Sequence, residues 1–249
     1  DSFVHNPAMG IHSYIEFGNR TLFFLLEVVA ILALIALWKF RKARPDLFWL
    51  VVIPTLSIPI QAVLGGITVL TDLNPYVVGV HFLVSVVLVV LAALLVKRAY
   101  EPGGPRAVVV SAPLLQNTWI AAIAGMVTVV VGTLLTGSGP HAGDGGAARN
   151  GLDSAVVQTL HVAPAYATLI FTALVCFLAY QERAFSVQRF ASWALVVMAL
   201  QIMVGIAQAR LALPPMLVGI HMVLACLLAS ALFLMLVETR QRVRVAVAS

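Results

Sequence analysis

Residues 61–81 read QAVLGGITVLTDLNPYVVGVH, and residues 201–221 read QIMVGIAQARLALPPMLVGIH. The Gln, Gly, Leu, Pro, Val and His of the two stretches coincide at a single offset of 140 residues. A duplication that retains a polar Gln and a His within apolar surroundings retains residues able to carry chemistry. The histidines of this repeat are therefore the first candidates for a functional site.

The composition around the repeat predicts a membrane protein. Hydrophobic residues make up 61% of the 249-residue chain and charged residues only 10%, against about 25% charged in soluble proteins. Uncharged runs of about 18 or more residues are typical of membrane-spanning helices. Seven such runs predict an all-α polytopic membrane protein: 20–38, 47–70, 76–96, 114–136, 155–180, 187–208 and 215–237.

The net charge of +5 follows this topology and does not indicate a nucleic-acid partner. Along a seven-span path, three basic residues fall on the same side as residue 1: Arg20, Arg149 and Arg210. The other basic residues fall on the opposite side: Lys39, Arg41, Lys42, Arg44, Lys97, Arg98, Arg106, Arg183, Arg189, Arg240, Arg242 and Arg244. By the positive-inside rule that side is cytoplasmic, so we expect Asp1 outside and Ser249 inside.

The repeat extends over most of the chain and predicts its organisation. Spans 47–70 and 76–96 match 187–208 and 215–237, and span 20–38 matches 155–180. The equivalent of span 114–136 would precede residue 1. We therefore expect two tandem four-helix bundles with pseudo-twofold symmetry along the membrane normal, the first helix being absent from this chain. The expected domains are an N-terminal half at 1–100 and a C-terminal half at 101–249.

Three histidines share one depth in the predicted bundle. His81 and His221 each lie six residues after the proline of their turn, and His161 lies seven residues after Ser154. At ~1.5 Å per residue, all three are about 9–10 Å inside the external surface. A lone membrane histidine commonly forms only an interhelical hydrogen bond. Three at one depth favour a ligand site, because ionisable groups in a bilayer usually face the bundle interior with a partner.

Haem is the partner that these histidines fit best. Two neutral imidazoles from facing helices can take the two axial positions of a haem iron inside an apolar bundle. Zinc or manganese would need a denser set of Cys, Asp or Glu ligands. The chain has no CxxCH motif, which excludes covalent c-type attachment. His161 and His221 are the predicted pair in the C-terminal half.

The N-terminal half departs from this pattern. Asn19 stands at the position equivalent to His161 and is a poor haem ligand, whereas His81 is retained. Glu16 lies about one helical turn from Asn19, and His12 lies another turn beyond. An acid, a histidine and an incomplete coordination site indicate a place for substrate. The alternative for Glu16 is a solvated carboxylate at a helix start, favoured by the helix dipole.

Several segments together resemble haem A synthase in its bacterial form, and the resemblance covers essentially the whole chain. They are IEFGNR at 15–20, TGSGPHAGD at 136–144, RNGLD at 149–153, QTLH at 158–161 and the two P-x-x-V-G-x-H helices. The resemblance implies eight helices in two halves and a multi-pass enzyme of the bacterial plasma membrane. It implies the conversion of haem O to haem A by oxidation of a porphyrin methyl group to a formyl group.

The resemblance also implies roles for the candidate residues. The family carries a glutamate followed three residues later by a histidine, and here these positions are Glu16 and Asn19. Haem O would bind near His81 as substrate, with His12 or Asn19 as the open question for its second ligand. Haem b would be bound by His161 and His221. Glu16 would be the catalytic acid or base, and the implied partners are haem O synthase and terminal-oxidase assembly factors, besides membrane lipid.

Other polar residues in or near the spans receive simpler predictions. Arg20 and Arg210 lie at external helix ends and are candidates to bind haem propionates, with a lipid-facing position as the alternative. Gln61 and Gln201 are expected to bond across helices. Glu27 is expected to form an interhelical hydrogen bond, with a proton-path role as the alternative. His141 and Asp144 are candidates for parts of a loop lid. Cys176 and Cys226 are expected to pack in the core.

Two other functions share some of these features. A di-haem electron-transfer protein like cytochrome b would use the same histidine layer, but it would call for a histidine at Asn19 and would not need Glu16. A transporter built from tandem repeats would need helices broken near the bilayer centre. The prolines lie mostly near helix ends, with Pro54, Pro59 and Pro164 as exceptions, so the enzyme is favoured over both.

Overall fold

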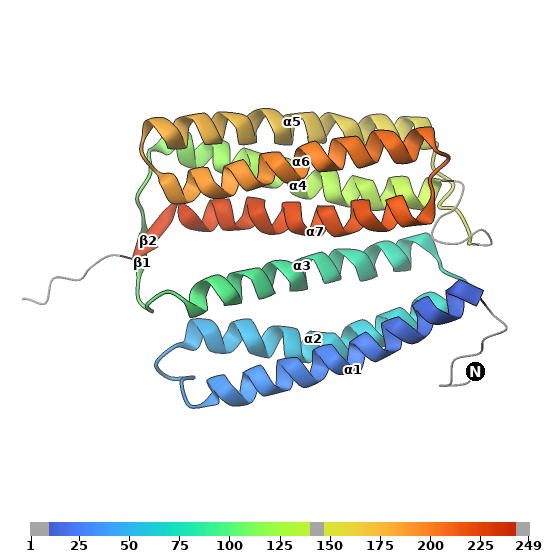
Figure 1. Cartoon of the computed structure of the whole chain (residues 1–249), viewed down its shortest axis with the longest axis horizontal. Helices are drawn as coiled ribbons and strands as arrows, with labels where there is room; N and C mark the ends of the chain where they lie inside the picture. The colour runs from blue at the N-terminus through green and yellow to red at the C-terminus, as the bar shows by residue number, and fades with distance from the viewer. Residues whose placement is uncertain (1–9, 140–146, 243–249) are drawn as a thin grey trace, which may run out of the picture.

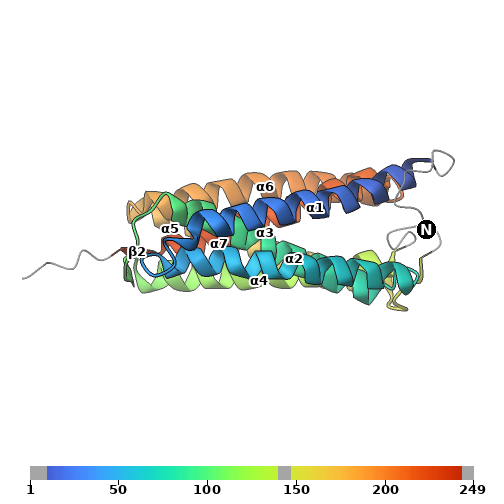
Figure 2. The ribbon, with the colours of Figure 1, turned by 90° about the horizontal axis from the view of Figure 1, so that it is seen from below.

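The computed structural model describes residues 10–139 and 147–242. For residues 10–17, 19 and 20 of the first helix it describes the backbone only. Seven helices lie side by side along the long axis of the molecule (Figures 1 and 2). Each helix is long and apolar enough to span a membrane, which confirms the predicted all-α polytopic class. Their bounds are α1 Gly10–Trp38, α2 Pro45–Leu70, α3 Pro75–Ala99, α4 Ala112–Ser138, α5 Ser154–Gln181, α6 Phe185–Arg210 and α7 Pro215–Glu238.

Local sequence explains where several helices begin. Proline occupies one of the first two positions of α2, α3, α4 and α7, where its fixed φ suits the helix and its missing N–H costs nothing. The side chain of Asn74 accepts a hydrogen bond from the Tyr76 amide at the start of α3. Asp153 accepts from the amides of Ala155 and Val156 at the start of α5.

Helix α1 differs from the prediction at its N-terminal end. The apolar run was expected to begin at residue 20, but the helix begins at Gly10. The preceding turns contain His12, Ser13, Glu16 and Asn19, so they lack the apolar character on which the prediction depended. The candidate residues Glu16 and Asn19 therefore lie on a continuous helix that extends beyond the apolar span, in agreement with the helical spacing assumed for them.

The turns between α2 and α3 and between α6 and α7 have the same backbone geometry. In the first, Asp72 and Leu73 have φ values of 51° and 58°, and in the second Ala212 and Leu213 have φ values of 57° and 59°. The Leu73 amide donates to the Thr68 carbonyl at 2.8 Å, and the Leu213 amide donates to the Gln208 carbonyl at 2.8 Å. Left-handed backbone costs a residue other than glycine about 1 kcal/mol or more. The repeat thus retains a strained turn as well as its side chains.

The C-terminal half forms a closed four-helix bundle. Helix α4 packs against α5, α5 against α6, α6 against α7, and α7 returns to α4. Its core is made of small and medium apolar side chains, with Leu114, Val175 and Met235 completely buried. In such a ring α5 and α7 occupy diagonal corners.

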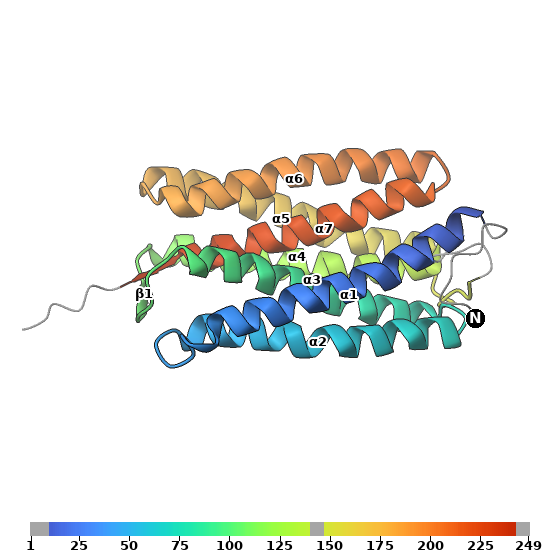
Figure 3. The same cartoon turned by 60° about the horizontal axis from the view of Figure 1, so that its bottom comes forward.

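The N-terminal half is more open. Among the described elements, α1 contacts α2 alone, whereas α3 contacts α2, α4 and α7 and so joins the two halves. Figure 3 shows α1 running obliquely along α2. None of the apolar window of α1 is buried within the chain. The helix predicted ahead of residue 1 stays a prediction.

A short two-stranded sheet fastens the linker between the halves to the end of α7. Strand β1 is Arg106–Val108 and strand β2 is Arg240–Arg242. They pair antiparallel, with Arg106 opposite Arg242. The Val109 amide also donates to the Thr239 carbonyl at 3.0 Å. This sheet lies at the opposite end of the bundle from the α2–α3 and α6–α7 turns (Figure 1).

Candidate functional site

The three histidines of the predicted layer lie near one end of the bundle. His81 is in the second turn of α3, His161 in the second or third turn of α5, and His221 in the second turn of α7. All three helices begin at the end that carries the two strained turns. Each histidine is half-buried in the chain. The predicted common depth therefore agrees with the helix bounds.

Each histidine ring lies against a glycine of the preceding helix. A Cβ at Gly65 of α2 would lie 3.5 Å from Cε1 of His81, and one at Gly205 of α6 would lie 3.4 Å from Cε1 of His221. The contact is tightest at Gly132 of α4, where a Cβ would lie 3.0 Å from Cε1 of His161 and 3.3 Å from its Nδ1. The missing side chain gives each imidazole room between two helices.

The glycine–histidine contacts were only partly visible in the sequence. Gly65 and Gly205 belong to the quoted repeat, but their relation to the histidines was not predicted. Gly132 lies in the helix that has no repeat partner within the chain, so the repeat gave no signal for it. Comparison of the three helical hairpins, each with a glycine before the turn and a histidine after it, would have found it.

His161 is held in one orientation by a backbone carbonyl. Its Nδ1 lies 3.0 Å from the carbonyl oxygen of Thr128 on α4. A carbonyl can only accept, so Nδ1 carries the proton and the ring donates. In the neutral ring this leaves Nε2 with its lone pair available. An Nδ1–H bond to a backbone carbonyl is the usual support for a histidine that binds a metal through Nε2.

His81 and His221 have a different environment at Nδ1. Both atoms are enclosed and have no hydrogen-bond partner within the described residues. Buried polar atoms are normally paired, so these two rings lack the carbonyl partner that fixes Nδ1 of His161. The ligand roles of His81 and His221 stay predictions.

The two repeated glutamines do not behave alike. Gln61 donates from Nε2 to the His81 carbonyl at 3.0 Å and to Ser85 Oγ at 2.7 Å, so the predicted bond across helices is formed in the N-terminal half. Gln201 forms neither of these Nε2 bonds among the described residues, whereas the Oε1 atoms of both glutamines are enclosed and lack a partner there. The residue equivalent to Ser85 is Ala225, which has no hydroxyl to offer.

The arrangement of the helices brings His161 and His221 toward a shared interior. They lie on α5 and α7, the diagonal corners of the closed bundle, and at matching distances from the helix starts. Two imidazoles on diagonal helices, with one free Nε2 fixed by its hydrogen bond, are a donor set that fits the two axial positions of a haem iron.

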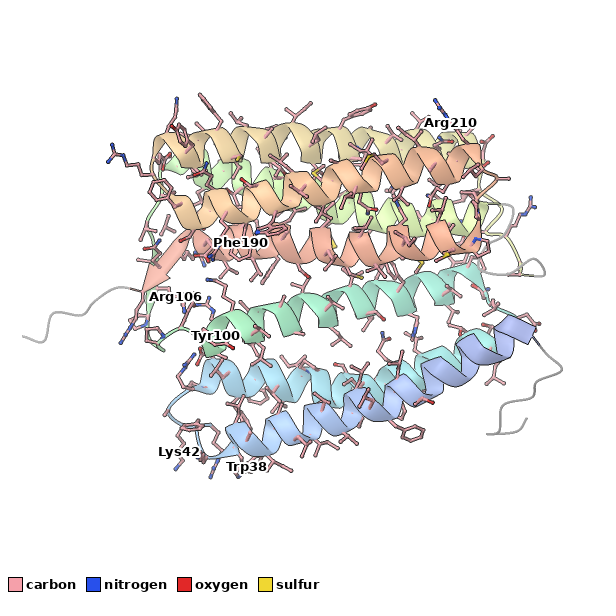
Figure 4. All side chains as sticks on the ribbon, in the orientation of Figure 1. Trp38, Lys42, Tyr100, Arg106, Phe190 and Arg210 are labelled. Carbon is pink, nitrogen blue, oxygen red and sulfur yellow. The ribbon has the colours of Figure 1, made fainter. Side chains whose placement is uncertain are left out.

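Other predicted residues lie apart from this set or outside what is described. The side chains of Glu16, Asn19, Arg20 and His12 lie outside the described residues, as do the loop residues His141 and Asp144. Arg210 is exposed at the end of α6 and points away from the bundle (Figure 4). No ion pair of Arg210 occurs among residues 10–139 and 147–242.

The remaining polar candidates within the spans are separate from the histidines. The Oε2 atom of Glu27 is enclosed and has no partner in the described part of the chain, so this oxygen does not form the interhelical hydrogen bond that the sequence predicted. Cys176 and Cys226 are free thiols. Cys176 Sγ lies 3.5 Å from Ser192 Oγ, and neither thiol is completely buried.

Comparison with known proteins gives this arrangement a context. The model of the cytochrome oxidase assembly protein family COX15-CtaA matches residues 9–237. Proteins named heme A synthase from Listeria monocytogenes serovar 1/2a and from Listeria welshimeri are each 28% identical to this chain over 124 residues. These alignments cover 49% of this chain and 41% of each relative. No solved structure matches the chain. With the family model matching across all seven helices, the chain belongs to the COX15-CtaA family of cytochrome oxidase assembly proteins.

Proposed function

We propose that this protein is a haem A synthase, which oxidises a methyl group of haem O to a formyl group and supplies haem A to terminal oxidases. The family match over residues 9–237 carries the proposal, and relatives named heme A synthase support it. The three histidines that pack against glycines support it chemically. Their ring nitrogens would be available to haem iron in each half of an apolar bundle.

In the C-terminal half, His161 and His221 would hold haem b as a resident cofactor. Their diagonal helices and the Nδ1 bond of His161 to Thr128 support this assignment. When bound, haem b supplies one-electron transfer. The chain's part is to keep both rings neutral and oriented, to exclude water with its apolar walls, and to leave room for the rings at Gly132 and Gly205.

In the N-terminal half, haem O would bind as substrate with its iron at His81. Asn19 stands where a second histidine would complete the coordination. One coordination position of the haem O iron would therefore have no histidine ligand. The Gln61 bonds to the His81 carbonyl and to Ser85 would fix the turn of α3 that carries the ligand. Only one protein ligand would then hold the molecule that must leave as product.

Glu16 is the proposed catalytic residue. Two successive oxidations of the methyl group, each adding a hydroxyl from water and releasing two protons and two electrons to an external electron acceptor, would give a hydrated aldehyde, which becomes the formyl group on loss of water. The Glu16 carboxylate would stabilise positive charge that develops at the methyl carbon, or accept a proton from that carbon or from the attacking water. Glu16 lies near the start of α1, His81 lies near the start of α3, and both helices pack against α2. This placement supports a role for Glu16 on the substrate side.

The charge distribution supports an orientation for the enzyme. Basic residues gather at the end opposite the histidines, so the histidine layer would lie toward the outer face of a bacterial plasma membrane. The reaction requires a source of haem O and a recipient of haem A. A haem O synthase and the assembly factors of a terminal oxidase are the corresponding partners.

Product analysis tests the proposal. The chain is produced in membranes that contain haem O, and the extracted haems are separated by chromatography. Wild type is expected to form haem A, and Glu16→Ala is expected to form none while retaining its haem b. Glu182→Ala, at the opposite end of the chain's helices, serves as the carboxylate control. Haem A at the wild-type rate in Glu16→Ala would refute the role of Glu16, and its absence from the wild type would refute the function.

A further inference from the structure

An open pocket lies at the end of the molecule opposite the histidines. It has a volume of about 670 Å³ and is bordered by α2, α3 and the linker that leads to β1. Leu50 of α2 and Leu94 of α3 contribute apolar surface, and Arg98 and Arg106 contribute guanidinium groups. The pocket therefore combines an apolar part facing the membrane span with a basic part at its end.

The charged groups around this pocket do not balance. Five basic residues lie in or beside it: Arg44, Lys97, Arg98, Arg106 and Arg242. Three carboxylates contact them: Asp46, Glu101 and Glu238. Glu101 is shared by three cations, at 2.5 Å from Lys97, 2.6 Å from Arg106 and 3.4 Å from Arg98. An excess of positive charge remains after every ion pair is counted.

Most of these cations are shielded from bulk solvent. The side chains of Lys97, Arg98 and Arg106 are only 13%, 15% and 17% exposed. A guanidinium group has five N–H donors, and the ion pairs of Arg98 and Arg106 each engage one of their nitrogens. Half-enclosed donors and unbalanced charge are unfavourable without an anion. The site therefore calls for an acceptor with several oxygens.

Two glycines of the linker allow the arginines to gather. A Cβ at Gly103 would lie 2.7 Å from Cδ of Arg44, and one at Gly104, which has a φ of 131°, would lie 3.0 Å from Nε of Arg242. Arg44 comes from the α1–α2 connection and Arg242 from β2. The basic residues thus converge from segments far apart in the sequence, and the glycine backbone leaves them space.

We propose that this pocket binds the phosphate headgroup of an anionic glycerophospholipid, with an acyl chain along Leu50 and Leu94. Arginine pairs with phosphate through two N–H donors at once, and basic pockets between membrane helices on the cytoplasmic side suit lipid head groups. Trp38, Lys42, Tyr100 and Arg106 lie at this end of the bundle (Figure 4), as expected for the membrane–water interface. A free phosphate ion would use the arginines but not the apolar surface.

Native mass spectrometry of the purified full chain tests this assignment. The protein is equilibrated with phosphatidylglycerol and phosphatidylcholine together, and the retained lipids are counted. Wild type is expected to retain phosphatidylglycerol in preference. Arg242→Gln, which removes a cation with no ion pair in the described part of the chain, should lower this retention about tenfold. Arg210→Gln makes the same charge change at the opposite end and should leave it unchanged.

A second variant separates a lipid from a free anion. Leu94→Trp keeps every charge and fills the apolar part of the pocket, so it should also reduce phosphatidylglycerol retention. The lipid assignment is overturned if both variants retain the lipid as wild type does, or if phosphatidylcholine is retained equally. It is also overturned if Leu94→Trp has no effect and inorganic phosphate displaces the bound lipid, since the ligand would then be the ion. Size-exclusion profiles identify any variant that has lost its fold.

Discussion

The two halves of this protein share a scaffold but differ around their histidines. The α2–α3 and α6–α7 turns have left-handed backbone conformations at equivalent positions. A Cβ at Gly65 or Gly205 would lie 3.5 or 3.4 Å from Cε1 of the facing histidine. In the C-terminal half, α4 closes a ring around His161 and His221, whereas α1 contacts only α2 among the described elements. Duplicated backbone has therefore been kept while the surroundings of the site diverged. The clearest difference lies at the histidines themselves, because Nδ1 of His161 is bonded to a carbonyl of α4 and Asn19 stands at the position equivalent to His161.

Removal of one imidazole from the closed half should have the largest effect. His161→Ala is expected to lose nearly all bound haem b, because the iron loses an axial ligand and the Thr128 carbonyl loses its donor. The haem b content of purified protein, measured by pyridine haemochrome, checks this. Tyr166→Phe, an exposed position on the same helix, serves as the control. Undiminished haem b in His161→Ala would remove the distinction drawn between the halves.

The two glycine–histidine contacts of the C-terminal half give a graded prediction. Gly132→Ala should lower haem b occupancy about tenfold, since its Cβ would lie 3.0 Å from the His161 ring and overpacking of this kind costs about 1–3 kcal/mol. Gly205→Ala should have a smaller effect, because 3.4 Å is an ordinary contact. Gly219→Ala is the control, with nothing within 4 Å of its Cβ. Haem titration that gives equal occupancy for Gly132→Ala and Gly219→Ala would contradict the role of the contact.

The hydrogen bonds of Gln61 should contribute a moderate amount of stability to the open half. Ser85→Ala removes the 2.7 Å bond from Gln61 Nε2, which is worth about 1 kcal/mol. The thermal midpoint of unfolding in detergent is expected to fall by about 2–4 °C. Ser57→Ala, a serine of α2 whose side chain has no hydrogen bond within the described part of the chain, provides the comparison. A midpoint that does not change would show that the Gln61 bond to the His81 carbonyl is sufficient.

The converse substitution should give the smallest effect. Ala225→Ser places a hydroxyl at the position equivalent to Ser85, within reach of Gln201 if the two halves share their geometry. We expect a gain of about 0.5 kcal/mol, seen as a small rise in the unfolding midpoint, with haem b content unchanged. A fall in the midpoint would show that the space around Ala225 differs from that around Ser85.

The sequence predicted the fold more completely than the site. Long apolar runs require helices in a membrane because no water is present to satisfy the backbone, so the spans followed directly. The start of α1 at Gly10 did not follow, since a polar helical extension has no hydropathy signal. The repeat identified His81 and His221 as the first candidates for the site.

The details of the site depended on contacts between helices. The proximity of Gly132 to His161 and the bond from His161 to the Thr128 carbonyl depend on how α4 and α5 approach each other, which periodicity does not specify. The divergence of Gln61 and Gln201 likewise depends on one residue, Ser85 against Ala225. The pocket at the basic end depends on arginines that come together from four separate segments.

Haem analysis of single-histidine variants tests the central claim of two unequal sites most directly. Wild type, His221→Ala and His81→Ala are purified, and their haems are extracted, identified and quantified by pyridine haemochrome. We expect His221→Ala to lose haem b and to keep haem O or haem A. We expect His81→Ala to keep haem b and to lose haem O and haem A. Equal haem b in both halves, with no haem O or haem A, would contradict the account and favour an electron-transfer protein.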